Sequence, residues 1–178
     1  MTEAEVSLYI ALYYIRNGLT DKDVHVSIDG AHVKTGETIH FDILKFYSEQ
    51  GFLKLDDDTD RWQGKYAVEG FNPNVIVCST PGVGDVKIET KDGKTILVES
   101  KKGKKDKKGQ EYPLMREAIG QLMTGSELDE SIVPVVAVPY TEKSFQLAER
   151  WSKLSQIRNV GIKFFLVQED GNICVVDR

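Results

Sequence analysis

The stretch GDVKIETKDGKTILVESK, residues 84–101, decides the fold of this chain. Two segments of alternating apolar and polar residues flank a glycine-containing turn at residues 91–93, a pattern typical of a β-hairpin. A two-residue turn would pair Val86 with Glu99 and send Asp85 to the opposite face. A three-residue turn with its glycine in the left-handed conformation pairs Asp85 with Glu99 instead.

The three-residue turn is favoured because it separates apolar from polar side chains. Successive residues of a strand point to opposite faces, and a buried face fixes the register of a hairpin strongly. This register gives one apolar face, made of Val86, Ile88, Ile96 and Val98, and one polar face, made of Asp85, Lys87, Glu89, Thr95, Glu99 and Lys101.

The polar face carries a combination of side chains that suits phosphodiester hydrolysis. Asp85 and Glu99 offer hard oxygen ligands for Mg²⁺ or Mn²⁺, and the carbonyl of Ser100 can add another. A metal held there lowers the pKa of a bound water and neutralises charge on a phosphate. Lys101 would orient that water or stabilise the transition state. The alternative is an exposed hairpin whose charges are simply solvated.

Two segments of the sequence, PGVGD at 81–85 and ILVESK at 96–101, resemble the PD-(D/E)xK nuclease superfamily. Archaeal Holliday-junction resolvases, RecB-type nuclease domains and many restriction endonucleases belong to it. The resemblance covers roughly residues 38–140. Pro81 lies four residues before the aspartate rather than next to it, a spacing that varies across the superfamily.

The resemblance implies a Mg²⁺- or Mn²⁺-dependent nuclease that acts on DNA. In such proteins the Asp and Glu hold the metal and the Lys is catalytic, which implies these roles for Asp85, Glu99 and Lys101. It also implies an α/β fold, the restriction-endonuclease-like sandwich, in which helices flank a mixed central β-sheet. The core of that fold is ordered helix–strand–strand–strand–helix–strand. The motif names a superfamily and leaves the substrate open.

A helix predicted over residues 38–50 provides a further candidate ligand. Its buried stripe consists of Ile39, Ile43, Leu44, Phe46 and Tyr47. His40 falls within this stripe and is expected to point inward. RecB-type nucleases place a histidine on such a helix as an additional metal ligand, so the resemblance implies that role for His40. The alternative is a buried histidine that is satisfied by a backbone carbonyl.

A second amphipathic helix is predicted over residues 114–124. Gln121 lies at the margin of its apolar stripe. RecB-type nucleases carry a Gln-Leu-x-x-Tyr motif on the equivalent helix; here Gln121-Leu122 is present and the tyrosine is absent. The resemblance implies that Gln121 contacts the nucleophilic water or a phosphate. Arg116 points off the stripe and is a candidate phosphate contact. Both residues are also compatible with an ordinary helix surface.

Charge is unevenly distributed along the chain. The formal net charge is −5, which counts against a general nucleic-acid binder, because Lys and Arg supply phosphate affinity. A basic run nevertheless begins at the proposed catalytic lysine and suits a nucleic-acid strand, although a solvated loop would look the same. Besides Lys101, the run contains Lys102, Lys104, Lys105, Lys107 and Lys108.

The length of 178 residues fits a single domain. We expect residues 38–178 to form the nuclease core. Residues 1–35, with a helix over 3–16 and strands over 24–28 and 31–34, would be an N-terminal appendage. A homodimer is expected only if both strands of a duplex are cut. The remaining hypothesis is a catalytically inactive nucleic-acid-binding or interaction protein that retains the nuclease fold.

The sequence has no apolar run long enough to span a membrane and no signal peptide, which indicates a cytoplasmic protein. Cys78 and Cys174 both lie in apolar, strand-like segments, where free thiols are expected. Substrate structure, sequence specificity and biological pathway are left open.

Overall fold

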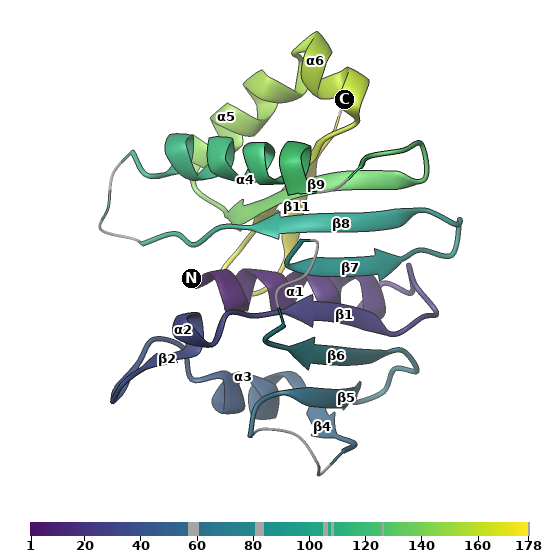
Figure 1. Cartoon of the computed structure of the whole chain (residues 1–178), viewed down its shortest axis with the longest axis vertical. Coiled ribbons are helices and arrows are strands. Elements are labelled where there is room, and N and C mark those ends of the chain that lie inside the picture. Colours follow the sequence, from purple (N-terminus) through teal and green to yellow (C-terminus); the bar gives the residue numbers. More distant parts are fainter. Residues whose placement is uncertain (57–60, 81–83, 105–106, 108, 126, 178) are drawn as a thin grey trace.

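The computed structural model describes residues 1–56, 61–80, 84–104, 107, 109–125 and 127–177. Within this part of the chain, a nine-stranded mixed sheet has the strand order β11-β10-β9-β8-β7-β1-β6-β5-β4 (Figure 1). Its strands are β1 (Val24–Ser27), β4 (Phe52–Lys54), β5 (Gly64–Val68), β6 (Asn74–Cys78), β7 (Val86–Glu89), β8 (Thr95–Ser100), β9 (Ile132–Pro139), β10 (Lys163–Val167) and β11 (Ile173–Val176). A separate small sheet consists of β2 (Lys34–Thr35) and β3 (Thr38–Ile39).

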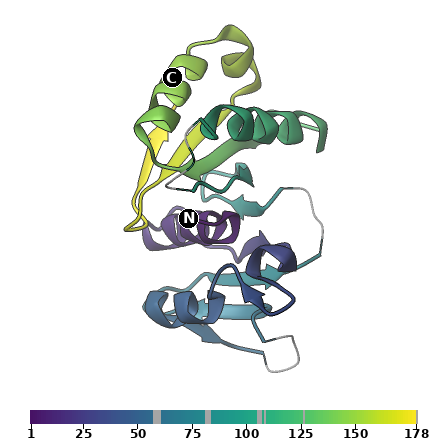
Figure 2. The ribbon, with the colours of Figure 1, turned by 90° about the vertical axis from the view of Figure 1, so that its left-hand side faces the viewer.

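Helices pack on both faces of the large sheet, which confirms the expected α/β class. They are α1 (Glu3–Arg16), α2 (Gly30–Val33), α3 (Ile43–Gln50), α4 (Glu111–Gly125), α5 (Glu142–Ser152) and α6 (Ser155–Val160). The buried residues of α1 and α3 belong to one core cluster, and those of α4 and α5 to a second. In Figure 2, α1 and α3 lie on one side of the sheet and α4 on the other. None of the described helices is long and apolar enough to cross a membrane.

The β7–β8 hairpin has the register that the sequence predicts. Val86 pairs with Val98 and Ile88 with Ile96, so the three-residue turn is confirmed. Gly93 takes a positive φ of 80° in this turn, and the Thr90 N–H donates to the Lys94 carbonyl at 2.8 Å. The polar face is interrupted at Leu97, which is buried in the cluster under α4 and α5.

The N-terminal segment is part of the core, so the expected appendage over residues 1–35 is wrong. Helix α1 starts at a capping box in which Thr2 and Glu5 satisfy each other's backbone N–H groups. Its apolar residues surround most of the helix, a pattern of a fully buried helix. Strand β1 lies between β7 and β6 in the middle of the sheet. Removing this segment would therefore divide the sheet.

Two predicted elements around residue 40 are wrong. The segment expected to be a strand over 31–34 is the helical turn α2, which Asp29 caps by accepting from the Ala31 N–H at 2.9 Å. Helix α3 begins at Ile43 and not at residue 38, because Asp42 serves as its N-cap and accepts from the Lys45 N–H. The residues just before it form the small β2–β3 hairpin instead.

Several chain segments meet along the side of the sheet where strands terminate, on the left of Figure 1; we call this side the edge of the sheet. Strands β1, β8 and β9 end there, whereas β7 begins there, because β7 is antiparallel to both β1 and β8. The N-terminus of α1 lies at the same edge. This convergence places side chains from distant parts of the sequence next to the hairpin residues singled out above.

Candidate metal centre

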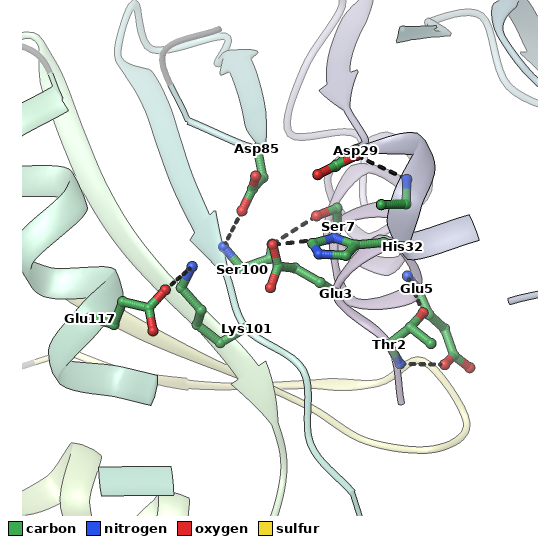
Figure 3. Close-up of polar contacts among 11 residues, drawn as sticks. Thr2, Glu3, Glu5, Ser7, Asp29, His32, Asp85, Ser100, Lys101 and Glu117 are labelled. Carbon is green, nitrogen blue, oxygen red and sulfur yellow. Dashed lines mark hydrogen bonds and ion pairs between the residues drawn. The ribbon is translucent and has the colours of Figure 1, made fainter. Parts of the chain in front are cut away.

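Asp85 is fixed by backbone contacts on both sides. Its N–H donates to the Val98 carbonyl at 2.7 Å, and its carbonyl accepts from the Ser27 N–H at 2.8 Å. Its carboxylate Oδ2 accepts from the Ser100 N–H at 2.7 Å, as Figure 3 shows. The side chain of residue 85 is thus held against the end of β8, where the register predicts it.

Gly84 makes this position of Asp85 possible. Its φ is +76°, a backbone conformation that residues other than glycine rarely adopt. A Cβ atom at this position would lie 2.7 Å from Leu97 Cδ1 and 3.0 Å from the Val98 carbonyl oxygen. The chain can therefore approach β8 closely only because residue 84 has no side chain.

Asp85 and Glu99 share a site where their negative charges are poorly solvated. Burial raises the pKa of Asp85 to about 6, an effect that the hydrogen bond from Ser100 partly offsets and that the Glu3 charge increases. Burial, together with the negative charge of Asp85, raises the pKa of Glu99 to about 7. Burial is thus the first cause of both shifts, and the two carboxylates repel each other, so each favours its neutral form more than an exposed carboxylate does.

Lys101 directly follows β8, beside Asp85 and Glu99, and is almost fully buried, with 5% of its surface exposed; we call the place where these three residues meet the corner. Its N–H donates to the Ala137 carbonyl of β9 at 2.8 Å, which fixes its backbone. Its Nζ pairs with Glu117 Oε1 of α4 at 3.2 Å (Figure 3). The Lys101 charge lowers the pKa values of both Asp85 and Glu99. All three residues predicted from the hairpin therefore come together.

Glu3, at the start of α1, is a third carboxylate of this cluster that the sequence analysis missed. Burial raises its pKa, and the charges of Lys101 and Lys102 lower it. His32 of α2 lies on its other side, with Nδ1 at 3.6 Å from Glu3 Oε1. One turn further along α1, Ser7 Oγ donates to Ser100 Oγ at 2.8 Å. The capping box gives the register of α1, and Glu3 and Ser7 share a helix face.

His40 lies outside this cluster. It precedes α3 rather than lying on it and is exposed, and its Nε2 is 3.1 Å from Thr35 Oγ1. The expectation that His40 points inward from a helix is wrong, because α3 begins only at Ile43, after its N-cap Asp42.

The predicted residues of α4 are exposed on the helix surface. Gln121 is exposed, and Arg116 places its guanidinium carbon 5.5 Å from the ring centroid of Tyr112. The side chain of α4 that reaches Lys101 is Glu117, one helical turn before Gln121. Helix α4 thus reaches Lys101 through Glu117, a residue that the sequence alone does not single out.

The basic run starts beside the carboxylates. Lys102, Lys104 and Lys107 are exposed, and Lys102 is near enough to Glu3 to lower its pKa. The Gln110 carboxamide holds the backbone of Lys104, accepting from its N–H and donating to its carbonyl. Lys105 and Lys108 lie outside the described residues, as does the PGV segment at 81–83.

The donor set of this corner fits a small divalent cation. Within the described residues, no three or more His, Cys, Asp or Glu side chains are already arranged around a common metal position. Mg²⁺, however, keeps several water ligands and is commonly held by one or two carboxylates. Asp85 and Glu99 provide two, the Ser100 carbonyl is a further oxygen, and Glu3 is a nearby carboxylate. A cation here would also relieve the raised pKa values.

Comparisons of the chain with protein-family models, with curated proteins and with solved structures found no match.

Proposed function

We propose that this protein is a metal-dependent nuclease that hydrolyses DNA phosphodiester bonds with a metal-activated water. The observation that carries the proposal is the corner at which Asp85, Glu99 and Lys101 meet, with the pKa of Asp85 raised to about 6 and that of Glu99 to about 7. Carboxylates whose pKa values are strongly shifted by burial and by neighbouring charges are typical of catalytic and metal-binding sites.

The arrangement of the elements supports the resemblance to the PD-(D/E)xK superfamily. Helix α1, strands β1, β7 and β8, helix α4 and strand β9 follow one another in the order helix–strand–strand–strand–helix–strand. In this order α1 takes the place of the first helix, rather than the segment 38–50. Strands β1, β7 and β8 are antiparallel neighbours, and β9 pairs parallel with β8. The segment from α2 to β6 is then an insertion between the first two core strands.

A Mg²⁺ or Mn²⁺ ion bound at this corner would supply an acidified water and positive charge for the phosphate. Asp85 and Glu99 would hold the ion, with the Ser100 carbonyl as an additional oxygen. The Ser100 N–H keeps the Asp85 carboxylate oriented, since it donates to Oδ2 at 2.7 Å. Glu3 would add a further negative charge beside the ion on the α1 side.

Lys101 would act on the reacting phosphate or on the attacking water. A buried ammonium has few alternative orientations, so its charge is directed at a fixed point. Glu117 accepts from Lys101 Nζ at 3.2 Å and balances its charge. Lys102, Lys104 and Lys107 extend the positive charge outward from the corner and are the candidate contacts to the DNA backbone.

Plasmid nicking in Mg²⁺ or Mn²⁺ tests the proposed activity. The wild type should nick supercoiled DNA with either ion and lose this activity in EDTA. Asp85→Ala should abolish both nicking and Mn²⁺ binding in isothermal titration. Lys101→Ala should retain Mn²⁺ binding and lose cleavage.

The matched controls come from the other end of the same hairpin. Glu89→Ala and Lys91→Ala change the same types of charge at exposed positions far from the corner, and both should cleave like the wild type. Retention of DNA binding without cleavage under any of these ionic conditions would favour the catalytically inactive binding protein instead. Cleavage that Lys101→Ala leaves unchanged would refute the role of the lysine.

A further inference from the structure

A pocket of about 490 Å³ opens at the same edge of the sheet, next to the candidate metal centre. It lies where β8, β9 and β10 end, and its lining includes Gly103, Lys104, Glu111, Pro139, Tyr140 and Val167. We call it the edge pocket. Gly103 follows Lys101 by two residues, so the pocket begins within about 7 Å of the catalytic lysine along the chain. That separation is comparable to one nucleotide step of an extended strand.

The walls of the edge pocket suit a flat ring. Tyr140 is 39% exposed even though it directly follows a buried strand, and Pro139 and Val167 add apolar surface beside it. Aromatic side chains of this kind are the platforms on which single-stranded nucleic acids stack their bases. The volume lies within the range of small-molecule sites.

Glu111, in the first turn of α4, is an acceptor without a full set of donors. Its Oε1 accepts from Thr141 Oγ1 at 3.1 Å. Its Oε2 is buried and has no hydrogen-bond partner among the described residues. A buried acceptor that lacks a partner is costly, and a carboxylate can be satisfied only by a donor. A ligand that presents an N–H group to Glu111 would provide one.

The charge of the lining favours an uncharged ring over a phosphate. Lys104 and Lys107 contribute positive charge, whereas Glu5, Glu111 and Glu169 contribute negative charge. A nucleobase with an exocyclic amino group is neutral, stacks and donates, and so matches all three features of the pocket.

We propose that the edge pocket binds an unpaired nucleobase next to the scissile phosphate and prefers bases that carry an amino group. The inference rests on the proposed nuclease function, because the strand is directed to the pocket by the metal centre beside it. The base must be unpaired, since Glu111 would take the place of its Watson–Crick partner. The preferred substrate is thus DNA with a single-stranded or unpaired nucleotide at the cleavage point.

Fluorescence anisotropy in EDTA tests the pocket without requiring cleavage. The probes are labelled ten-nucleotide strands of deoxycytidine, whose bases carry an amino group, and of thymidine, whose bases carry none, together with a blunt duplex. The wild type should bind the deoxycytidine strand at least about fivefold more tightly than the other two. Tyr140→Ala should weaken that binding about tenfold. Glu111→Gln should bring the ratio between the two single strands close to one, because an amide both donates and accepts.

Phe71→Ala is the matched control for Tyr140, because Phe71 is 40% exposed and lies in the turn between β5 and β6. Glu142→Gln is the control for Glu111, since it also changes a first-turn glutamate. Both should bind like the wild type. Equal affinities of the wild type for the two single strands, or equal effects of Tyr140→Ala and Phe71→Ala, would overturn the proposal.

The same proteins separate the two hypotheses when Mg²⁺ is added. Cleavage of DNA by the wild type, with no pocket-dependent selectivity, would retain the nuclease and reject the base pocket. Selective binding that Tyr140→Ala and Glu111→Gln both reduce, with no cleavage of any substrate, would reject the nuclease and leave a nucleobase site.

Discussion

Asp85→Asn should stabilise the metal-free protein at high pH, by an amount that disappears in acid. Burial raises the pKa of Asp85 from 3.8 to about 6, so the folded protein holds this proton more tightly than the unfolded chain does. Stability therefore falls as the pH rises from about 4 to about 6 and stays low above that range. At 1.36 kcal/mol per pKa unit, this corresponds to at most about 3 kcal/mol. Partial exposure of the carboxylate reduces the expected effect to about 2 kcal/mol.

The substitution keeps the shape of the side chain and the acceptor for the Ser100 N–H, and it removes only the charge. Urea unfolding in EDTA at pH 4, 6 and 8 measures the effect. The free energy of unfolding of Asp85→Asn should match that of the wild type at pH 4 and exceed it by about 2 kcal/mol at pH 8. A variant that is less stable than the wild type at pH 8, or a difference independent of pH, would refute the reasoning.

The control substitution and the metal ion sharpen the test. Asp92→Asn, in the turn of the same hairpin, removes a carboxylate whose pKa is lowered, first by the hydrogen bond from Thr90, and it should not stabilise the protein at pH 8. Saturating Mn²⁺ should reverse the order of Asp85→Asn and the wild type. An ion at one hundred times its dissociation constant adds about 2.7 kcal/mol to a protein that binds it, and the variant lacks a ligand.

Three further outcomes follow from contacts around the site. Gly84→Ala should lower the melting temperature and abolish cleavage, because its Cβ would lie 2.7 Å from Leu97 Cδ1 at a φ of +76°; thermal unfolding and plasmid nicking measure both effects. Glu117→Gln should reduce the cleavage rate about tenfold while Mn²⁺ affinity stays unchanged, since it removes the negative charge that pairs with Lys101; single-turnover kinetics measure the rate and isothermal titration the affinity, and a loss of Mn²⁺ binding would contradict this. His40→Ala should leave cleavage within about twofold of the wild type, because its ring is exposed and its Nε2 lies 3.1 Å from Thr35 Oγ1; a large loss of cleavage would restore its role in the site.

The hairpin could be predicted from sequence because its determinants are local. A left-handed glycine, a three-residue turn and alternating side chains specify a single register, and that register brings Asp85 to Glu99. The helix over residues 3–16 is also predicted from local sequence, and the structure confirms its bounds. These features need no knowledge of which elements pack together.

The rest of the corner could not be predicted because it depends on packing between distant segments. Glu3 meets residues near positions 85 and 100 only because α1 lies across the sheet, and nothing near residue 3 encodes this. The position of His40 could not be predicted because the N-cap Asp42 decides where α3 begins. The helical spacing of apolar residues continues before Asp42 in the sequence and does not mark that boundary. The family motif points to Gln121, whereas the side chain that reaches Lys101 is Glu117, one helical turn earlier.

The energetic cost of the corner is itself an argument for a function. Glu3, Asp85 and Glu99 all have raised pKa values, with burial as the first cause in each. Lys101 lowers all three, yet it also pairs with Glu117, so the cluster keeps an excess of negative charge. A hairpin needs none of these carboxylates for its register, which the apolar face already fixes. This retained repulsion supports the proposed metal site, because a divalent cation would offset the negative charge and hard oxygen donors suit such an ion.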